Sequence, residues 1–600
     1  MNKQVKKRSE IEEPYKWDLT DLIASQEALE ILIGEIREAV SRYASYRGTL
    51  ADSPKALAEY LAFDDSVSLK LSKLSAYASQ RNDEDVSVSK YQALLAMAGA
   101  LSSRAAEASA YAEPEILAVP GDTMAAFLES EELSLYKRKL ERILAKKEHM
   151  LSEAEERLLA RAEDALSAPS VIFKRFNNAD LVFPDIRDGN GETLPVSHGR
   201  YGSLMEHADR NVRREAFSAY YEPYIQFGNT AAAMFEGNVK QACLVAGVRN
   251  YASSRAYYLA ENEIPERVYD NLLSVVEERI GLLHRYIAIK KKLLGLDRVH
   301  MYDLYAPVPG MTEKTYSYKE AQELILTALA PLGEEYTRIL KHGFESRWID
   351  VYENQGKRSG AYSNSVYGVH PYVLMQFDGT FQSVITLAHE MGHALHSWYS
   401  SHNQPYPYAR YKIFVAEVAS TCNEVLLLQY MMDHASGEEE RTYLALQLME
   451  RFRTVLFRQA MFAEFEWKAH QLAWEDTPLT KELLCGIYHE LNVKYFGPQA
   501  VVDAKIDYEW ERIPHFYSPF YVYQYATGFS AATAIAGRVY AEHGREQGAL
   551  EGYFRFLKGG CSQTPVGLLR LCGVDMETPR AVNEALDLFE RLIKEREQSL

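Results

Sequence analysis

The chain has 600 residues, of which 47% are hydrophobic and 25% are charged, and its formal net charge is −18. This length predicts several substructures rather than one small core, and the composition is that of ordinary globular proteins. The negative charge argues against nucleic acid and anionic membranes as partners, because both bind basic surfaces.

The N-terminal third of the chain is predicted to be helical and to carry no chemistry. Residues 1–16 are polar and charged, and we expect them to form a flexible arm. Residues 17–200 are expected to form a helical domain, with a helix start at Ser53-Pro54 and a capping box at Ser152–Glu155. This domain is expected to end in a small β element.

The β element is predicted from two apolar runs. Val171–Phe176 and Leu181–Ile186 flank an Asn-Asn turn, and Asp188–Gly191 forms a second tight turn. Such runs between turn residues are typical of short antiparallel strands. We place the domain boundary after this element, so that residues 201–600 form a second domain.

A strand followed by a helix is predicted in the middle of the chain. Tyr372–Phe377 resembles a strand, and a turn leads from it into a helix over Gly379–Ser400 that Thr380 can cap. An extended peptide can pair with the free edge of such a strand through backbone hydrogen bonds. Gly360 and Tyr372 are therefore candidate substrate-binding residues.

This helix carries the motif His389-Glu390-Met391-Gly392-His393. Histidines four residues apart share one face of a helix, so both imidazoles can bind the same metal ion. Glu390 flanks that position and can take a proton from a bound water. The motif is the HExxH arrangement of zinc hydrolases, and it predicts one Zn²⁺ per chain.

A third protein ligand is expected, because catalytic zinc usually has three. His396 lies on the same face, but successive turns of one helix place side chains along a line rather than around a tetrahedron. A carboxylate from a second, crossing helix fits this geometry better, and Glu417 lies in the next predicted helix. It is an acidic residue on an apolar face, and buried carboxylates are rare unless they are paired or bound to a metal. Glu424, two turns later, is a candidate to orient a ligand histidine through its free ring N–H.

The segments His389–His396 and Phe414–Ser420 resemble the matching segments of the M3 family of zinc metallopeptidases. The resemblance covers nearly the whole chain and is greatest to the oligoendopeptidase F branch of that family. It implies that His389, His393 and Glu417 hold the zinc and that the glutamate of the motif is the general base.

The same resemblance implies a fold and a substrate. The fold is expected to be mainly α, a multi-helical zincin-like metallopeptidase with a small β element beside the zinc helix. An internal substrate channel or cleft formed by helical domains is expected, and residues 201–600 are expected to form the M3-like catalytic domain. Such a cleft implies cleavage of internal bonds in short, unfolded peptides. The alternatives are a zinc carboxypeptidase or peptidyl-dipeptidase on the same scaffold, and a non-catalytic peptide-binding protein.

A second chemical signal is an aromatic cluster near residue 520. It has His515 and four tyrosines within eleven residues, and it is similar to the His- and Tyr-bearing segment of M3 peptidases. Neutral O–H and imidazole donors stabilise the negative oxygen that forms when water attacks a peptide carbonyl. The resemblance implies this role for His515 and Tyr525. Tyr521 and Tyr523 are alternates and candidate substrate-binding residues.

Three features predict a cytoplasmic protein. No apolar run reaches the roughly 18 residues of a membrane span, and no apolar region of a signal peptide follows the charged start. The five cysteines are scattered, none in a Cys-x-x-Cys pair, and we expect them to be reduced thiols.

Overall fold

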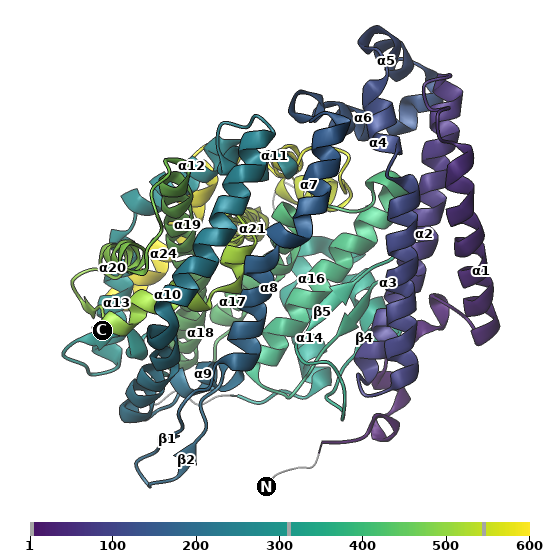
Figure 1. Cartoon of the computed structure of the whole chain (residues 1–600). Coiled ribbons are helices and arrows are strands. Elements are labelled where there is room, and N and C mark those ends of the chain that lie inside the picture. The colour runs from purple at the N-terminus through teal and green to yellow at the C-terminus, as the bar shows by residue number, and fades with distance from the viewer. Residues whose placement is uncertain (1–4, 309–313, 543–547, 600) are drawn as a thin grey trace. The chain divides into compact units, whose positions relative to one another are not determined.

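The computed structural model describes residues 5–308, 314–542 and 548–599. This part of the chain is mainly helical with three small sheets, as predicted (Figure 1). None of its helices combines the length and apolar character needed to cross a membrane. None of its five cysteines forms a disulfide.

Contacts between residues divide the chain into two compact units, each assembled from three separate segments. Unit 1 comprises residues 1–148, 313–427 and 535–573, and unit 2 comprises residues 149–312, 428–534 and 574–600. The two domains predicted for residues 17–200 and 201–600 therefore contribute to both units, and the boundary near residue 200 stays a prediction.

Unit 1 opens with three long helices, α1 (Gln26–Arg42), α2 (Pro54–Glu84) and α3 (Ser89–Ser109), which lie side by side (Figure 1). Ser53 caps α2 by accepting a hydrogen bond from the Ala56 N–H, and Pro54 occupies the first helical position, as predicted. The other helices that lie wholly or mostly in this unit are α4 (Ala112–Ala118), α5 (Gly121–Leu128), α6 (Lys137–Leu144), α14 (Tyr318–Ala328), α15 (Gly333–Glu345), α16 (Phe381–Asn403), α17 (Ile413–Asp433), α22 (Gly548–Leu557) and α23 (Pro565–Leu571).

A three-stranded sheet of unit 1 lies beside α16. Its order is β4 (Ile349–Asp350), β6 (Tyr372–Leu374) and β5 (Tyr362–Asn364), with β4 parallel and β5 antiparallel to β6. The predicted strand Tyr372–Phe377 is therefore the shorter, central β6. Both of its edges are paired, so the prediction that a peptide adds to this strand is wrong. Within the described residues, β5 is the strand beside α16 whose outer edge has no neighbour.

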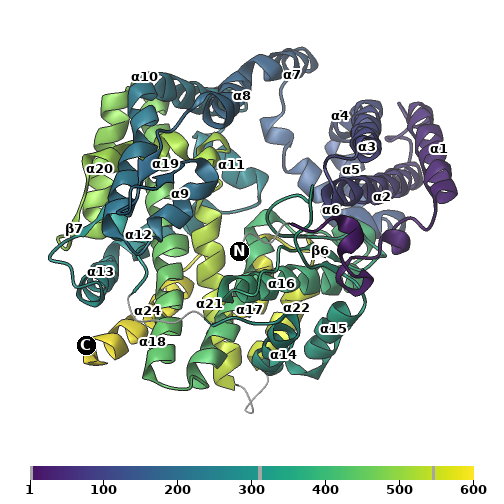
Figure 2. The ribbon, with the colours of Figure 1, turned by 90° about the horizontal axis from the view of Figure 1, so that it is seen from below.

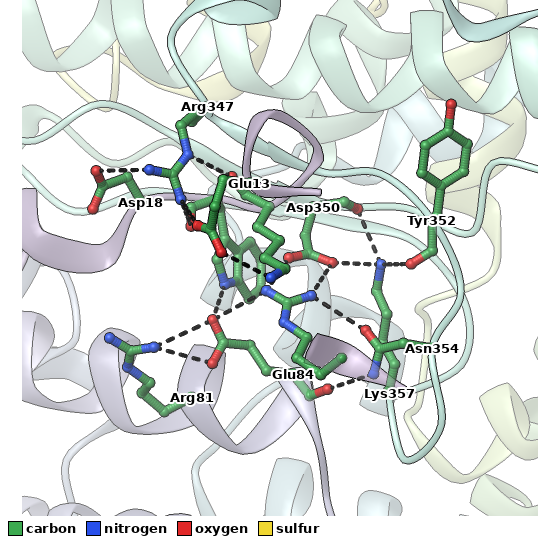
Figure 3. A network of polar contacts seen from close by, with 12 residues as sticks. Glu13, Asp18, Arg81, Glu84, Arg347, Asp350, Tyr352, Asn354 and Lys357 are labelled. Atoms are coloured by element: carbon green, nitrogen blue, oxygen red, sulfur yellow. Dashed lines mark hydrogen bonds and ion pairs between the residues drawn. The ribbon is translucent and has the colours of Figure 1, made fainter. Parts of the chain in front are cut away.

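The N-terminal segment is attached to unit 1, although the sequence predicts a flexible arm over residues 1–16. Figure 3 shows the polar network that attaches it. Arg8 Nη1 donates to Asp350 Oδ1 at 2.7 Å, and Arg8 Nη2 lies 3.3 Å from Glu84 Oε1. Lys357 Nζ lies 2.7 Å from the same Asp350 oxygen, and these two side chains are 0% and 1% exposed. Buried charges are tolerated when they are paired, so the network joins the described part of the segment to the loop before β5.

Replacing Lys357 by methionine is expected to destabilise unit 1 by about 2–3 kcal/mol. Lys357 Nζ also donates to the carbonyl oxygens of Asp350 and Tyr352 at 3.1 and 2.7 Å. The variant removes one of the two cations that pair with a buried carboxylate and leaves both carbonyls without this donor. Urea unfolding followed by circular dichroism measures the effect.

The control is Lys341→Met, which removes an exposed ion pair with Glu345 at 3.7 Å. Exposed pairs contribute about 0–1 kcal/mol, so this variant should unfold nearly as the wild type does. Equal unfolding midpoints for Lys357→Met and Lys341→Met would contradict the role given to the buried pair.

Unit 2 is built around α10 (Arg210–Val248), a helix of 39 residues. The helices α8 (Ala168–Arg175), α9 (His198–Met205) and α19 (Arg458–Trp474) pack against it. The other helices and strands that lie wholly or mostly in this unit are α7 (Glu153–Leu166), α11 (Ser254–Glu261), α12 (Glu266–Glu278), α13 (Gly281–Leu293), β3 (Val299–His300), α18 (Glu438–Arg451), α20 (Lys481–Phe496), β7 (Ala500–Val501), α21 (Tyr523–Glu542) and α24 (Arg580–Ser599).

The β element predicted near residue 200 is half correct. β1 (Ile186–Arg187) and β2 (Thr193–Leu194) form an antiparallel pair around the predicted second turn. The run Val171–Phe176, however, lies mostly in α8 and is not a strand. Of the run Leu181–Ile186, only Ile186 belongs to a strand. The strand-like composition of Val171–Phe176 is overridden by packing, since α8 lies along α10 and Phe173 is 2% exposed, with its ring stacked 4.1 Å from that of Tyr517.

Candidate active site

The motif helix α16 begins at a turn that requires glycine. Thr380 caps the helix by accepting a hydrogen bond from the Ser383 N–H at 3.2 Å, as predicted. Gly379, just before it, has a φ of +86°, and a Cβ atom there would lie 2.9 Å from the carbonyl oxygen of Tyr316. Only glycine satisfies both conditions, so the turn fixes where the helix starts.

Within unit 1, α17 crosses α16 at close range beside the motif (Figure 2). A Cβ atom on Gly392 would lie 2.5 Å from the Cα of Ser420, so the crossing depends on the missing side chain. Asn423 Nδ2 adds a hydrogen bond to the carbonyl oxygen of Ala388 at 3.0 Å. This crossing brings Glu417 next to the motif histidines.

Three predicted ligand atoms form a nearly equilateral triangle. The Nε2 atoms of His389 and His393 lie 3.2 Å apart. Glu417 Oε2 lies 3.3 Å from the first and 3.6 Å from the second. Donor atoms at tetrahedral corners, each about 2.0–2.1 Å from a zinc ion, lie about 3.3–3.4 Å apart. Among the described residues, this is the group of His, Cys, Asp and Glu side chains that lies close enough to hold a metal ion.

The charges around this triangle favour a cation. Burial lowers the pKa of His389, but the carboxylates of Glu424 and Glu417 outweigh burial and raise it to about 10. Burial raises the pKa of Glu417, but its contacts with His389 and His393 outweigh burial and hold the pKa well below its usual range. The site therefore stabilises positive charge, whether as protons on the imidazoles or as a metal ion.

Two further glutamates flank the triangle. Glu424 is 3% exposed, and its Oε1 lies 2.5 Å from Nδ1 of His389, the ring nitrogen that faces away from the triangle. Glu390 is 7% exposed, and burial raises its pKa. Within the described residues, Oε2 of Glu390 has no hydrogen-bond partner. A buried carboxylate with a raised pKa and a free oxygen is suited to accept a proton.

His396, the rival ligand, lies apart from this group. It is 1% exposed, and its ring stacks on Tyr411 with the centroids 3.8 Å apart. Burial lowers its pKa to about 3, so the ring is neutral. His396 therefore packs within unit 1, consistent with the role that the family resemblance implies.

The aromatic cluster lies in unit 2, and three of its members meet. His515 Nε2 lies 3.3 Å from Tyr525 Oη, which lies 3.4 Å from Tyr521 Oη. Burial lowers the pKa of His515, so its imidazole is neutral at neutral pH. Tyr523 is only 1% exposed, packs against Tyr269 and lies outside the trio, and its role in substrate binding stays a prediction.

The two candidates near the sheet of unit 1 have different surroundings. Tyr372 is 1% exposed and packs edge-on against Trp17, with the ring centroids 6.3 Å apart. It packs within a hydrophobic cluster of unit 1, and its role in substrate binding stays a prediction. Gly360 has a φ of +88° and open space around its α-carbon, two residues before β5.

The sequence analysis does not identify Glu466, a buried glutamate that supports the aromatic cluster. Phe520 has a φ of +55°, which is uncommon for a residue with a side chain, and its N–H donates to Glu466 Oε1 at 2.7 Å. Glu466 is 0% exposed on α19. The available signal was a glutamate in an apolar stretch of helix, the same signal that identifies Glu417.

Comparison with known proteins agrees with these features. Residues 203–588 match the family model "Peptidase family M3", and residues 115–183 match the model "Oligopeptidase F". The chain is 46% identical to oligopeptidase PepF of Bacillus subtilis over 100% of this chain and 89% of that protein. It is 40% identical to group B oligopeptidase PepB of Streptococcus agalactiae, with 98% of each chain covered. The crystal structure of oligoendopeptidase-F from Enterococcus faecium matches with a TM-score of 0.75 and 36% identity, over 95% of this chain and 98% of that one.

Proposed function

Because the chain belongs to peptidase family M3, and is thus a peptide hydrolase, we propose that it is a zinc endopeptidase that cuts internal bonds of short, unfolded peptides. The triangle of His389, His393 and Glu417 carries this proposal, since its sides of 3.2, 3.3 and 3.6 Å suit a tetrahedral zinc ion. The favourable charge of the site supports the same assignment.

The proposed roles follow from the chemistry of each side chain. A zinc ion, when bound, would polarise the scissile carbonyl and acidify a water. Glu390 accepts the proton of the attacking water on its free carboxylate oxygen and then passes it to the leaving amine. For His515 and Tyr525 we propose hydrogen bonds from neutral donors to the developing oxyanion, the role that the family resemblance implies.

For substrate binding we propose the outer edge of β5. Its backbone N–H and C=O groups have no neighbouring strand within the described residues and can pair with an extended peptide. Such pairing recognises an extended backbone of any sequence, and the chain of a folded protein does not offer it. The open space around Gly360 leaves room for the peptide at the start of this strand.

A length series of quenched fluorescent peptides, extended to a folded protein and followed by mass spectrometry of the products, tests the proposal. We expect cleavage of internal bonds in short peptides, no cleavage of the folded protein, loss of activity with a zinc chelator and recovery with Zn²⁺. Release of single residues or of dipeptides from one terminus would instead indicate a carboxypeptidase or a peptidyl-dipeptidase. Binding without turnover would indicate a peptide-binding protein.

Replacing Glu424 by glutamine is expected to weaken zinc binding about 10- to 100-fold, because this carboxylate orients His389 and makes it a better ligand. Competition with a chromophoric chelator measures the affinity. Glu417→Gln, which removes a proposed ligand, is the comparison and should weaken binding more. Unchanged zinc affinity in Glu424→Gln would contradict the orienting role.

A further inference from the structure

Unit 1 contains a cavity of about 560 Å³ that no proposed metal ligand or catalytic residue lines. Its walls come from α2, from β5 and the residues after it, from the C-terminal half of α16, and from residues 406–411. A second cavity of about 450 Å³ shares Ser72, Asn364, Ser365 and Arg410 with the first. Arg410 therefore stands where the two cavities meet.

Of the two cations among the described residues that line this cavity, Lys139 forms ion pairs with carboxylates and Arg410 does not. Lys139 Nζ lies 3.5 Å from Asp64 and 3.1 Å from Asp65, and Asp64 also accepts a hydrogen bond from Tyr43 Oη at 2.8 Å. Arg410 is exposed, and in the described part of the chain its guanidinium pairs with no carboxylate. This guanidinium is thus the cation of the cavity that is free to bind an anion.

The walls around Arg410 are rich in hydroxyl groups. Arg410 Nη2 donates to Ser72 Oγ at 3.0 Å. Six serines line the cavity: Ser68, Ser72, Ser363, Ser365, Ser397 and Ser401. Hydroxyls can donate to an anion, and a guanidinium binds a carboxylate through two parallel hydrogen bonds. The cavity is therefore chemically complementary to a carboxylate.

The position of the cavity relates it to the path of the substrate. Ser363 and Asn364 belong to β5, whose free edge is the proposed peptide site. Ser397 and Ser401 follow the motif residue His393 by four and eight residues on α16. These spacings correspond to about 6 and about 12 Å along the helix axis, or about two to four residues of extended peptide.

We propose that this cavity binds a carboxylate of the peptide substrate and that Arg410 is the residue that recognises it. The proposal rests on the proposed function, because it takes the ligand to be a peptide paired with β5. The carboxylate can be the C-terminal one or an Asp or Glu side chain, about two to four residues from the bond that is cut. In the first case, the cavity selects peptides by the distance of that bond from the C-terminus.

Equilibrium binding of fluorescent peptides tests this proposal in a Glu390→Gln background, where turnover does not interfere. One pair of peptides differs only in a free C-terminal carboxylate against an amide. A second set has an amide C-terminus and carries Glu or Gln at each of the positions two to four residues from the cleavage site. In one of these two sets, we expect the peptide with the carboxylate to bind about tenfold more tightly than its uncharged partner, as for an exposed charge-assisted pair. The set that shows this difference identifies whether the cavity binds the C-terminal carboxylate or a side-chain carboxylate.

Adding Arg410→Gln should remove this preference and leave the affinity of the uncharged peptides unchanged. The control is Arg104→Gln on α3, which removes another exposed positive charge that lines neither cavity, and it should keep the preference. If neither set shows a preference, or if Arg410→Gln retains it, the proposal is wrong. Cleavage of the uncharged peptides by the wild type is a separate readout, and its absence would count against the proposed function and not against this site.

Discussion

Replacing Glu390 by glutamine is expected to lower kcat for peptide cleavage by about 10²- to 10⁴-fold, the usual contribution of a general base. Glutamine keeps the size of the side chain but cannot accept a proton from water. The surroundings of Glu390 suit a general base, because the residue is 7% exposed and burial raises its pKa. Its Oε2 has no hydrogen-bond partner within the described residues. Single-turnover cleavage of a quenched peptide measures the effect.

This prediction requires that the variant keep its metal site. Glu390 does not belong to the triangle of ligand atoms, so zinc content should equal that of the wild type. A variant that holds zinc and is inactive supports the role of general base. A variant that holds zinc and cleaves at the rate of the wild type would rule that role out.

Replacing Tyr525 by phenylalanine is expected to lower kcat by about 10²- to 10³-fold, with KM little changed, because the lost hydrogen bond acts on the transition state. The tyrosine O–H is poised for such a bond, since it lies 3.3 Å from His515 Nε2 and 3.4 Å from Tyr521 Oη on a partly exposed surface of unit 2. Steady-state kinetics on an internally cleaved peptide separate the two parameters.

Tyr517→Phe is the matched control for this prediction. Tyr517 belongs to the same segment, but its ring stacks on Phe173 and serves packing, so removal of its hydroxyl should leave kcat within a few-fold of the wild type. A loss of the same size in both variants would indicate a structural effect on the segment. An unchanged kcat in Tyr525→Phe would exclude this tyrosine as the oxyanion donor.

The candidate metal site could be predicted from the sequence because its geometry is largely local. His389 and His393 share a helix face by spacing alone, and Glu417 stands out as a carboxylate in an apolar stretch. The close crossing of α16 and α17 depends on Gly392 and Ser420 meeting, with a Cβ on the glycine only 2.5 Å from the serine Cα. The sequence contains that glycine but does not indicate which residue faces it.

The strand order near the site could not be predicted. Composition and the turn that follows predict a strand over Tyr372–Phe377, but they carry no information on its neighbours, which come from residues 349–350 and 362–364. As a result, the sequence predicts a free edge on β6, which is the central strand, whereas within the described residues β5 has the free edge. Ser363 of β5 and the other serines of the cavity beside it follow no strong sequence pattern, so the proposed carboxylate site emerges only from the fold.

The aromatic cluster shows a different limit. Tyr523 and Tyr525 are two residues apart at the start of α21, and in a helix such residues point in directions about 200° apart. One is therefore buried against Tyr269 and the other lies partly exposed next to His515. The number of aromatic residues in the segment does not distinguish Tyr523 from Tyr525. Their different exposure follows only once the start of helix α21 is known.

The central claim is that His389, His393 and Glu417 hold one zinc ion per chain. Elemental analysis by inductively coupled plasma mass spectrometry, on wild type and Glu417→Gln dialysed against the same limiting zinc concentration, tests it most directly. We expect one zinc per wild-type chain and a large loss of zinc in the variant, with the helical circular dichroism of both unchanged. A wild type without zinc, or a variant with the full wild-type content, would contradict the assignment.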